Sequence, residues 1–597
     1  GANDAIQSSQ ITFVGSGAGP LPSTGALIDP AMVMQFQNAQ HIAFESSGSI
    51  DFAGNVALTL PAGTLELSAG AFTAGSGGVV TVAAPIVQLT NDLGALTTGS
   101  VVATGGSLTI NTGELDFGVG GKAQSGFASI TVNAASGIVG QGAGSFDFGS
   151  APVVLNTPVI IAGAGSTQTL TTTGAFTVNG VAGAPLATTS VGGQIKLTGA
   201  ALTDSAPILA PAGNVSLEAT SGDLVLGQGA SITTAAVAKQ FFDVTEYAPA
   251  GAIILTADAG SVKIASGVTL DFSADGAGGG NAGSLSISAP TGTVALNGIL
   301  RGEAAPGNFG GSISLDVNGF DPASSVTTFD TFAAALMAAG INHQISVDTR
   351  TGDLSLSGTL AANQVSLTAD GGSIAVTGNI IALGTASSVG EIDLYGANAV
   401  DVEGTLLATG SPASQRPGGL INIGTTGTGN GTLNSTYGYQ NVDPSGSGKI
   451  IVGANATIDA SGGTITFRAP LLDANNASGI NVNIAIAPGA SIRGGTVNLD
   501  AYVVWSTADT VTNPNQHFDG IVDPAGWYDS SGNLLSGTFY DGSGNAVLAY
   551  TAGTMTAAQL ASYLTSDYFT PNTYYSPHAV FYGGYDPNTE SFNPASP

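Results

Sequence analysis

Histidine, serine and carboxylate side chains carry whatever chemistry this chain can perform, because it contains no cysteine. None of the four histidines has a second histidine or an acidic residue at zinc-ligand spacing. They are His41, His343, His517 and His578. We find no Gly-x-Ser-x-Gly motif in a strand-to-helix context and no phosphate-binding loop of the Walker type. The sequence therefore predicts no metal site, no cofactor and no nucleophilic catalytic set.

The carboxylates offer the one serious enzymatic alternative, a β-helical polysaccharide lyase or hydrolase. Such enzymes usually place carboxylates close together on one face, for acid/base work or for binding calcium. Here the sequence has no adjacent Asp-Asp pair and no Gly-His-Gly, and its acids are spread singly. Examples are Asp316, Asp353, Asp370, Asp393 and Asp401. We therefore predict a protein that is not an enzyme, with the polysaccharide-cleaving enzyme as the alternative.

The composition narrows the function further. Only 8% of the 597 residues are charged, the net charge is −30, and 43% of the residues are hydrophobic. A soluble domain usually has about 25% charged residues. The negative charge disfavours nucleic-acid partners, and the apolar content disfavours disorder. Because no run of about 20 apolar residues occurs, we expect no transmembrane segment.

Short alternating runs from about residue 49 to residue 500 indicate the elements of the fold. Residues 253–256, 261–264 and 268–272 have apolar side chains at every second position, which is the pattern of a half-buried strand. The runs themselves recur along the chain with a longer period. Similar runs recur 27 residues apart (365 to 392) and 26 residues apart (374 to 400 and 380 to 406). The chain is therefore predicted to be all-β, a parallel β-helix with three strands per turn.

Glycine, at 89 residues, suits the corners of such a helix, where positive φ angles are needed. A β-sandwich array is disfavoured, because no Asn-Gly hairpin signal separates the runs. The predicted organisation has four kinds of segment. These are an N-terminal segment or cap at 1–48, the β-helix at 49–500, corner insertions near 235–250, 320–344 and 424–446, and an aromatic-rich C-terminal cap region at 501–597.

One insertion should contain a helix. Phe329, Phe332, Leu336 and Met337 fall on one face of a helical pattern, and Gly340 lies at the position of a C-cap. The insertion at 235–250 is expected to be a loop that leaves one corner. We interpret all three insertions as additions to the corners, although contact with a partner is an open alternative.

The repeats also resemble a known family. Residues 347–354 lead into 364–374, and the pattern continues through 404–410 to 418–423. Over roughly residues 190–500 this resembles the filamentous-haemagglutinin-like exoproteins of Gram-negative bacteria. The resemblance implies a right-handed parallel β-helix, export to the outer cell surface by two-partner secretion, and work as an adhesin or fibre. The Asn-Pro-Asn-Gly-Ile-type secretion motif of the family is not found, and residues 513–515 (Asn-Pro-Asn) are followed by Gln516.

The function predicted from these observations is that of an extracellular structural or adhesive protein, a rigid rod that acts as an adhesin or as a self-assembling fibre subunit. Its expected partners are further copies of itself, packed end to end or laterally, or a surface glycan or host-cell surface. Aromatic side chains of the C-terminal region are the candidate contacts, because Tyr and Trp anchor interfaces and stack on sugars. They are Trp505, Trp527, Tyr528, Tyr574, Tyr575 and Tyr582.

Overall fold

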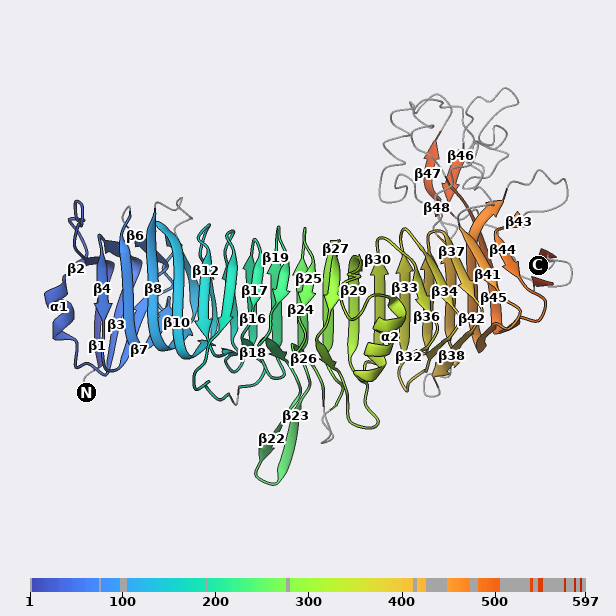
Figure 1. Cartoon of the computed structure of the whole chain (residues 1–597), viewed down its shortest axis with the longest axis horizontal. Helices are drawn as coiled ribbons and strands as arrows, with labels where there is room; N and C mark the ends of the chain where they lie inside the picture. Colours follow the sequence, from blue (N-terminus) through green and yellow to red (C-terminus); the bar gives the residue numbers. More distant parts are fainter. Residues whose placement is uncertain are drawn as a thin grey trace. The chain divides into compact units, whose positions relative to one another are not determined.

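The chain folds almost entirely into β-strands, most of which pair in parallel (Figure 1). A computed structural model describes residues 3–74, 77–96, 105–188, 190–274, 280–411, 416–425, 448–472, 481–504, 537–540, 546–550, 574–575, 585–586 and 591–592. The chain divides into two compact units. Unit 1 comprises residues 1–327 and 335–343, and unit 2 comprises residues 328–334 and 344–597. The all-β, parallel-strand architecture expected of a parallel β-helix is confirmed.

Unit 1 is built on rows of apolar side chains that run across successive parallel strands. One row begins at Ile42 of β3 (His41–Ala53) and ends at Leu300 of β28 (Ile299–Arg301). Its members are paired in register and buried, and they are Ile42, Leu65, Val87, Leu115, Ile138, Ile160, Ile208, Ile232, Leu270 and Leu300. Because successive side chains of a strand point to opposite faces, the residues between them form outward rows. The same register therefore sets both the core and the surface of the unit.

Aromatic rings fill part of the core of unit 1. The rings of Phe146 and Phe148 stack with their centroids 4.4 Å apart, and Phe117 contacts Phe146 edge-on at 6.2 Å. Near the start of the chain, Phe13 lies 4.9 Å from Phe44. Such offset and edge-to-face pairs add to the stabilisation that comes from burial alone.

The parallel pairing of unit 1 begins earlier in the chain than the sequence pattern indicates. Strand β1 (Asn3–Val14) pairs with β3, within the segment 1–48 that was expected to be an N-terminal segment or cap. Helix α1 (Pro30–Gln35) follows, with Asp29 as its N-cap. The register of β1 with β3 shifts between Ser8 and Gln10, and this irregularity interrupts the alternation that would have marked β1 as a member of the repeat.

The insertion at 235–250 is a β-hairpin rather than a loop. Strand β22 (Val237–Phe241) pairs antiparallel with β23 (Val244–Ala248), and the hairpin projects from the stacked strands of unit 1 (Figure 1). Its two-residue turn contains Phe242, whose φ of 54° lies in the left-handed region. An Asn-Gly signal would have indicated this turn, but the chain adopts it without one.

The predicted helix is present as α2 (Phe329–Ala338). Phe329, Phe332 and Leu336 are buried, whereas Met337 is half-buried. Gly340 has a φ of 71°, as the predicted C-cap requires. The insertion at 424–446 lies outside the described residues except for its first two positions.

Three strand pairs of unit 2 have the offsets that the sequence predicts. The pairs are β33 (Gln364–Ala369) with β36 (Glu391–Gly396), β34 (Ser373–Val376) with β37 (Ala399–Val402), and β35 (Asn379–Ala382) with β38 (Thr405–Ser411). Val365 pairs with Ile392, Ile374 with Val400, and Ile380 with Leu406, all in parallel. The spacing read from the chain is therefore the register of the sheet.

Among the described residues, no helix combines the length and the apolar character that crossing a membrane requires.

Candidate functional site

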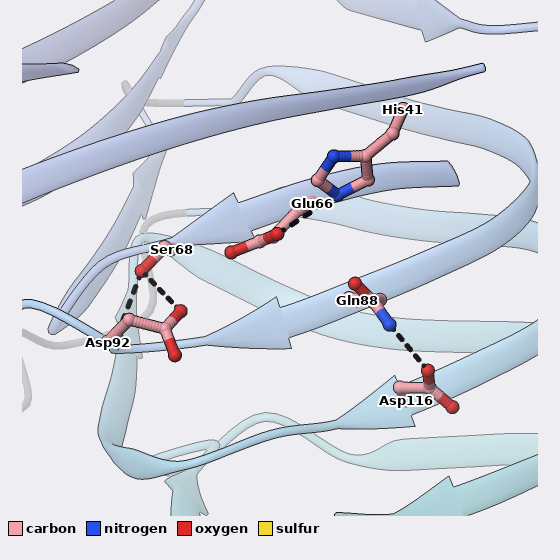
Figure 2. Close-up of polar contacts among 6 residues, drawn as sticks. All are labelled: His41, Glu66, Ser68, Gln88, Asp92 and Asp116. Carbon is pink, nitrogen blue, oxygen red and sulfur yellow. Dashed lines mark hydrogen bonds and ion pairs between the residues drawn. The ribbon is translucent and has the colours of Figure 1, made fainter. Parts of the chain in front are cut away.

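Polar side chains gather on an outward face of unit 1, where β5 (Thr64–Ser68), β7 (Val79–Thr90) and β8 (Gly106–Phe117) lie side by side (Figure 2). Glu66, Gln88 and Asp116 occupy matching positions on these strands, since Glu66 pairs with Gln88 and Gln88 with Asp116. Neighbouring strands are about 4.8 Å apart. Three residues that are distant in the sequence therefore form one short polar row.

This row lines a pocket of about 270 Å³, which we call the carboxylate pocket. Its lining residues are Glu66, Gln88, Thr90, Asp92, Asp116, Gly118, Val119, Gln141 and Gly142. The volume lies just below the usual range for small-molecule sites, about 300–1,000 Å³. The pocket contains three acidic side chains and no basic one, so it is a strongly negative cavity for its size.

Asp116 forms the buried end of the polar row. Gln88 donates a hydrogen bond from Nε2 to Oδ2 of Asp116 at 2.8 Å. The Asp116 residue is only 3% exposed, although it faces outward between the core residues Leu115 and Phe117. Burial raises the pKa of this carboxyl group, and hydrogen bonding to Gln88, Glu114 and Gln141 opposes the shift. In the part of the chain that the structure describes, Oδ1 of Asp116 has no hydrogen-bond partner.

Glu66 lies at the other end of the row, beside a histidine. Nε2 of His41 lies 3.1 Å from Oε2 of Glu66. Burial raises the pKa of the Glu66 carboxyl group, the nearby charge of Asp92 raises it further, and His41 acts in the opposite direction. Glu114, two residues before Asp116, also has a raised pKa, because of burial first and the charge of Asp116 second.

Asp92 follows β7 and is tied to β5 through a serine. Oγ of Ser68 donates to Oδ2 of Asp92 at 3.2 Å, and the backbone N–H of Asp92 donates to the same Oγ at 3.0 Å (Figure 2). The preceding residue, Asn91, donates from Nδ2 to the backbone oxygen of Gly121 at 2.7 Å. These bonds fix the turn after β7 against β5 and against the start of β9 (Gly120–Ser125).

A buried lysine holds the loop after β8, which forms one wall of the pocket. Nζ of Lys122 donates to the backbone oxygens of Gly118, Val119 and Gly120 at 2.8, 3.1 and 2.7 Å. Burial lowers the pKa of Lys122 to about 8, and the negative charge of Asp92 opposes the shift. Gly120 has a φ of 77°, and a Cβ there would lie 2.6 Å from the backbone oxygen of Asn91. The conformation of this wall is therefore fixed by contacts within the protein itself.

The structure brings together acids that are spread singly in the sequence. In unit 1, Glu66, Asp92 and Asp116 line one pocket, although 26 residues (66 to 92) and 24 residues (92 to 116) separate them in the chain. Sequence reasoning overlooked these residues, yet a signal was present. Glu66, Gln88 and Asp116 each lie between two apolar residues, at offsets of 22 (66 to 88) and 28 (88 to 116) residues. Polar residues that recur at the repeat spacing share one outward row.

The fold brings two of the four histidines next to partner side chains. His41 contacts Glu66, and the ring of His343 stacks on Phe309 at 4.5 Å, with Nδ1 3.2 Å from Oγ of Ser312. His517 and His578 lie outside the described residues. Within the described ranges, no three His, Asp or Glu side chains come together so that they could hold a metal ion.

The aromatic contact candidates receive little structural description. Tyr574 and Tyr575 form β48 (Tyr574–Tyr575), which pairs antiparallel with Val504 and Val503 of β45 (Ser491–Val504). The other candidates, Trp505, Trp527, Tyr528 and Tyr582, lie outside the described residues. Their role as contacts stays a prediction.

The fold and the carboxylate pocket define this chain as an all-β protein of stacked parallel strands with a polar cavity on one unit. Comparison with protein-family models, with curated proteins and with solved structures finds no match to the chain.

Proposed function

We propose that this protein is an extracellular structural or adhesive protein, built as a right-handed parallel β-helix with three strands per turn. The observation that carries the proposal is the register that aligns buried apolar side chains across successive strands. In unit 2 such a buried row runs through Ile345, Val365, Ile392, Ile421 and Ile465, and it continues to the half-buried Val497. A stack in which each strand bonds to the next is a stiff support, because bending it would break many backbone hydrogen bonds together.

Small uncharged side chains on the outward rows support this function. An asparagine ladder illustrates them: Asn133 donates to Asn111, Asn156 to Asn133, and Asn179 to Asn156, at 2.7–2.9 Å. Each amide hydrogen bond lies between adjacent strands and follows the direction of the stack. A surface of this kind can approach another surface closely without burying unpaired charge. We therefore propose that the partner is another copy, a surface glycan or a cell surface, and that the protein works on the outer surface of a Gram-negative bacterium.

Electron microscopy of the purified full chain tests the structural proposal. We expect filaments or laterally packed bundles at high protein concentration, and more of them near pH 4, where about half of the 40 carboxylates are protonated and most of the net negative charge is lost. Monodisperse particles at every concentration and pH would contradict assembly and leave adhesion as the function to test.

Adhesion is tested by binding of the chain to glycan arrays and to cell surfaces. We expect the double variant W527A/Y528A to lose most of the binding if the aromatic candidates form the contact. The control variant Tyr247→Ala removes an exposed aromatic side chain of β23 in unit 1 and should bind as the unaltered chain does. Equal binding by all three proteins would refute the aromatic assignment.

For the polysaccharide-cleaving alternative, the carboxylate pocket offers acids in a cavity, and a carboxyl group of raised pKa can act as a general acid. Incubation with uronate polysaccharides, with and without calcium, tests it. Depolymerisation that is lost in the variant Glu66→Gln would establish the enzyme and remove the purely structural proposal. We expect no depolymerisation.

A further inference from the structure

The carboxylate pocket of unit 1 has a charge that nothing inside it balances. Glu66, Asp92 and Asp116 line it, and no Lys or Arg does. The buried lysine behind the wall, Lys122, gives its three N–H groups to the backbone oxygens of residues 118–120. A complementary ligand must therefore bring positive charge.

A second observation points to a ligand independently of the charge. The Asp116 residue is only 3% exposed. Its Oδ1 atom is a hydrogen-bond acceptor that has no partner among the described residues. Figure 2 shows this oxygen on the side of the carboxyl group away from Gln88. A buried acceptor left without a donor costs free energy, more so when it is charged. A donor that entered the pocket would remove this cost.

The spacing of the acids separates an organic cation from a metal ion. Calcium needs six to eight oxygens at 2.3–2.6 Å from one centre, and no group of three acidic or histidine side chains in the described residues could hold a metal ion. The acids come instead from β5, from the turn after β7 and from β8. A guanidinium group is planar and has five N–H donors on three nitrogens that point in different directions, so it can bond to carboxylates that do not converge on one point.

We propose that the carboxylate pocket binds a guanidinium group, supplied either by a small molecule or by an arginine side chain of a partner protein. Asp116 accepts from it at the floor of the pocket, and Glu66 and Asp92 accept at the rim. The polar side chains Thr90 and Gln141 complete the lining. The bonds of Asn91 and Lys122 hold the wall in place, so that little ordering accompanies binding.

Binding should depend on pH in a definite direction. The titratable groups that line the pocket are Glu66 on β5, Asp92 after β7 and Asp116 on β8. Three further groups act on these acids from neighbouring positions: His41 on β3, Glu114 on β8 and Lys122 on β9 (Gly120–Ser125). Protonation of the acids removes the acceptor charge, so affinity should fall as the pH is lowered. Because the pKa values of Glu66 and Asp116 are raised, the fall begins at a higher pH than ordinary carboxylates would give.

Isothermal titration of the full chain with arginine amide at pH 7.5 tests the proposal, with repeat titrations at lower pH. We expect saturable binding that weakens about tenfold or more in the variant Asp116→Asn, because a charge-assisted hydrogen bond is lost. Glu66→Gln should weaken it less, since Glu66 lies at the rim. Asp258→Asn, which removes one exposed negative charge elsewhere in unit 1, is the matched control and should bind as the unaltered chain does.

Thermal unfolding of each variant establishes that it is folded. If Asp116→Asn does not fold, Glu66→Gln and the pH series carry the test. An extended peptide with a single arginine distinguishes the two sources: tighter binding than arginine amide indicates a partner protein, and equal binding indicates a small molecule. The proposal is overturned if the unaltered chain shows no saturable binding, if the pocket variants bind as Asp258→Asn does, or if calcium displaces the arginine amide.

Discussion

The two units each place an acid and an amide side by side on adjacent strands, but with different results. In unit 1, Gln88 donates to Asp116, and in unit 2, Nδ2 of Asn422 donates to Oδ1 of Asp393 at 2.8 Å. In both pairs, burial raises the pKa of the acid and the amide opposes the shift. The Asp393 residue is only half-buried, on β36 beside β40 (Leu420–Thr425), whereas Asp116 is buried in a pocket that Gly118, Val119, Gln141 and Gly142 also line.

The comparison shows that loops, rather than strands, make the difference between a surface pair and a site. The strand register alone brings an amide next to an acid in both units. In unit 1, residues 118–119 after β8 and residues 141–142 line the pocket together with the polar row. The enclosure removes water from Asp116, and with it the solvent that would satisfy Oδ1.

The largest expected effect comes from the core beneath both pairs. Leu115 precedes Asp116 and Leu394 follows Asp393, and both leucines are fully buried. Leu115→Ala and Leu394→Ala should each lower the free energy of unfolding by about 2–5 kcal/mol, because each leaves a cavity in a packed row. Denaturant unfolding measures both. A loss under about 1 kcal/mol in only one unit would break the comparison, since the two rows would then not be equally packed.

The next effect concerns an acid buried more deeply than either pair. Asp204 of β17 (Leu202–Asp204) lies between Val178 and Leu226 in a core row, and burial raises its pKa to about 7. An acid whose pKa is raised by folding stabilises the fold at low pH, and this contribution is lost as the pH rises through about 7. The free energy of unfolding of unit 1 should therefore rise as the pH is lowered from 8 to 5.

The variant Asp204→Asn sharpens this test of burial. At pH 8 it should raise the free energy of unfolding by on the order of 2–4 kcal/mol, because no charge then remains in the core. The gain should disappear near pH 4, where Asp204 is protonated. Thermal unfolding at the two pH values measures the difference, and a variant less stable than the parent at pH 8 would show that the carboxylate is needed for its bond to the backbone N–H of Ala206.

A smaller effect is expected from the wall of the carboxylate pocket, which lies beside the acid–amide pair of unit 1. Lys122→Met keeps the length of the side chain but leaves three backbone oxygens without their donor. We expect a loss of about 1–3 kcal/mol and faster hydrogen exchange for residues 118–122. Unchanged exchange in this loop would mean that the turn at Asn91 alone holds the wall.

The smallest expected effect is the difference in the free energy of unfolding between variants of the two amides. Gln88→Ala should cost about 1.5–3 kcal/mol, because it leaves a buried charged group without its donor, and Asn422→Ala about 0.5–1.5 kcal/mol, because Asp393 can recruit water. Carboxyl titration by NMR should show a further rise in the pKa of Asp116 that exceeds the rise at Asp393. Equal rises would mean that the loops of unit 1 do not exclude water.

The strand pattern of this chain was predictable because it depends on local alternation and on a spacing that the register must repeat. The pairing of Val365 with Ile392 follows directly from the 27-residue offset (365 to 392). The hairpin at β22 and β23 was missed, because its turn, Phe242-Asp243, lacks the Asn-Gly or Asp-Gly pair that usually marks such turns. Strand β1 was missed because a register shift interrupts its alternation.

The sequence by itself determined the all-β class, the parallel offsets of unit 2, helix α2 with Gly340 at its end, and the low charge of the surface. Only the tertiary structure decided that Glu66, Asp92 and Asp116 share a pocket. Their meeting depends on how many residues each turn of chain takes, which varies between 22 (66 to 88) and 28 (88 to 116) residues here. It depends as well on loops whose course is fixed by Lys122 and Asn91. Stacking of the strands brings into contact side chains that are distant from one another in the sequence.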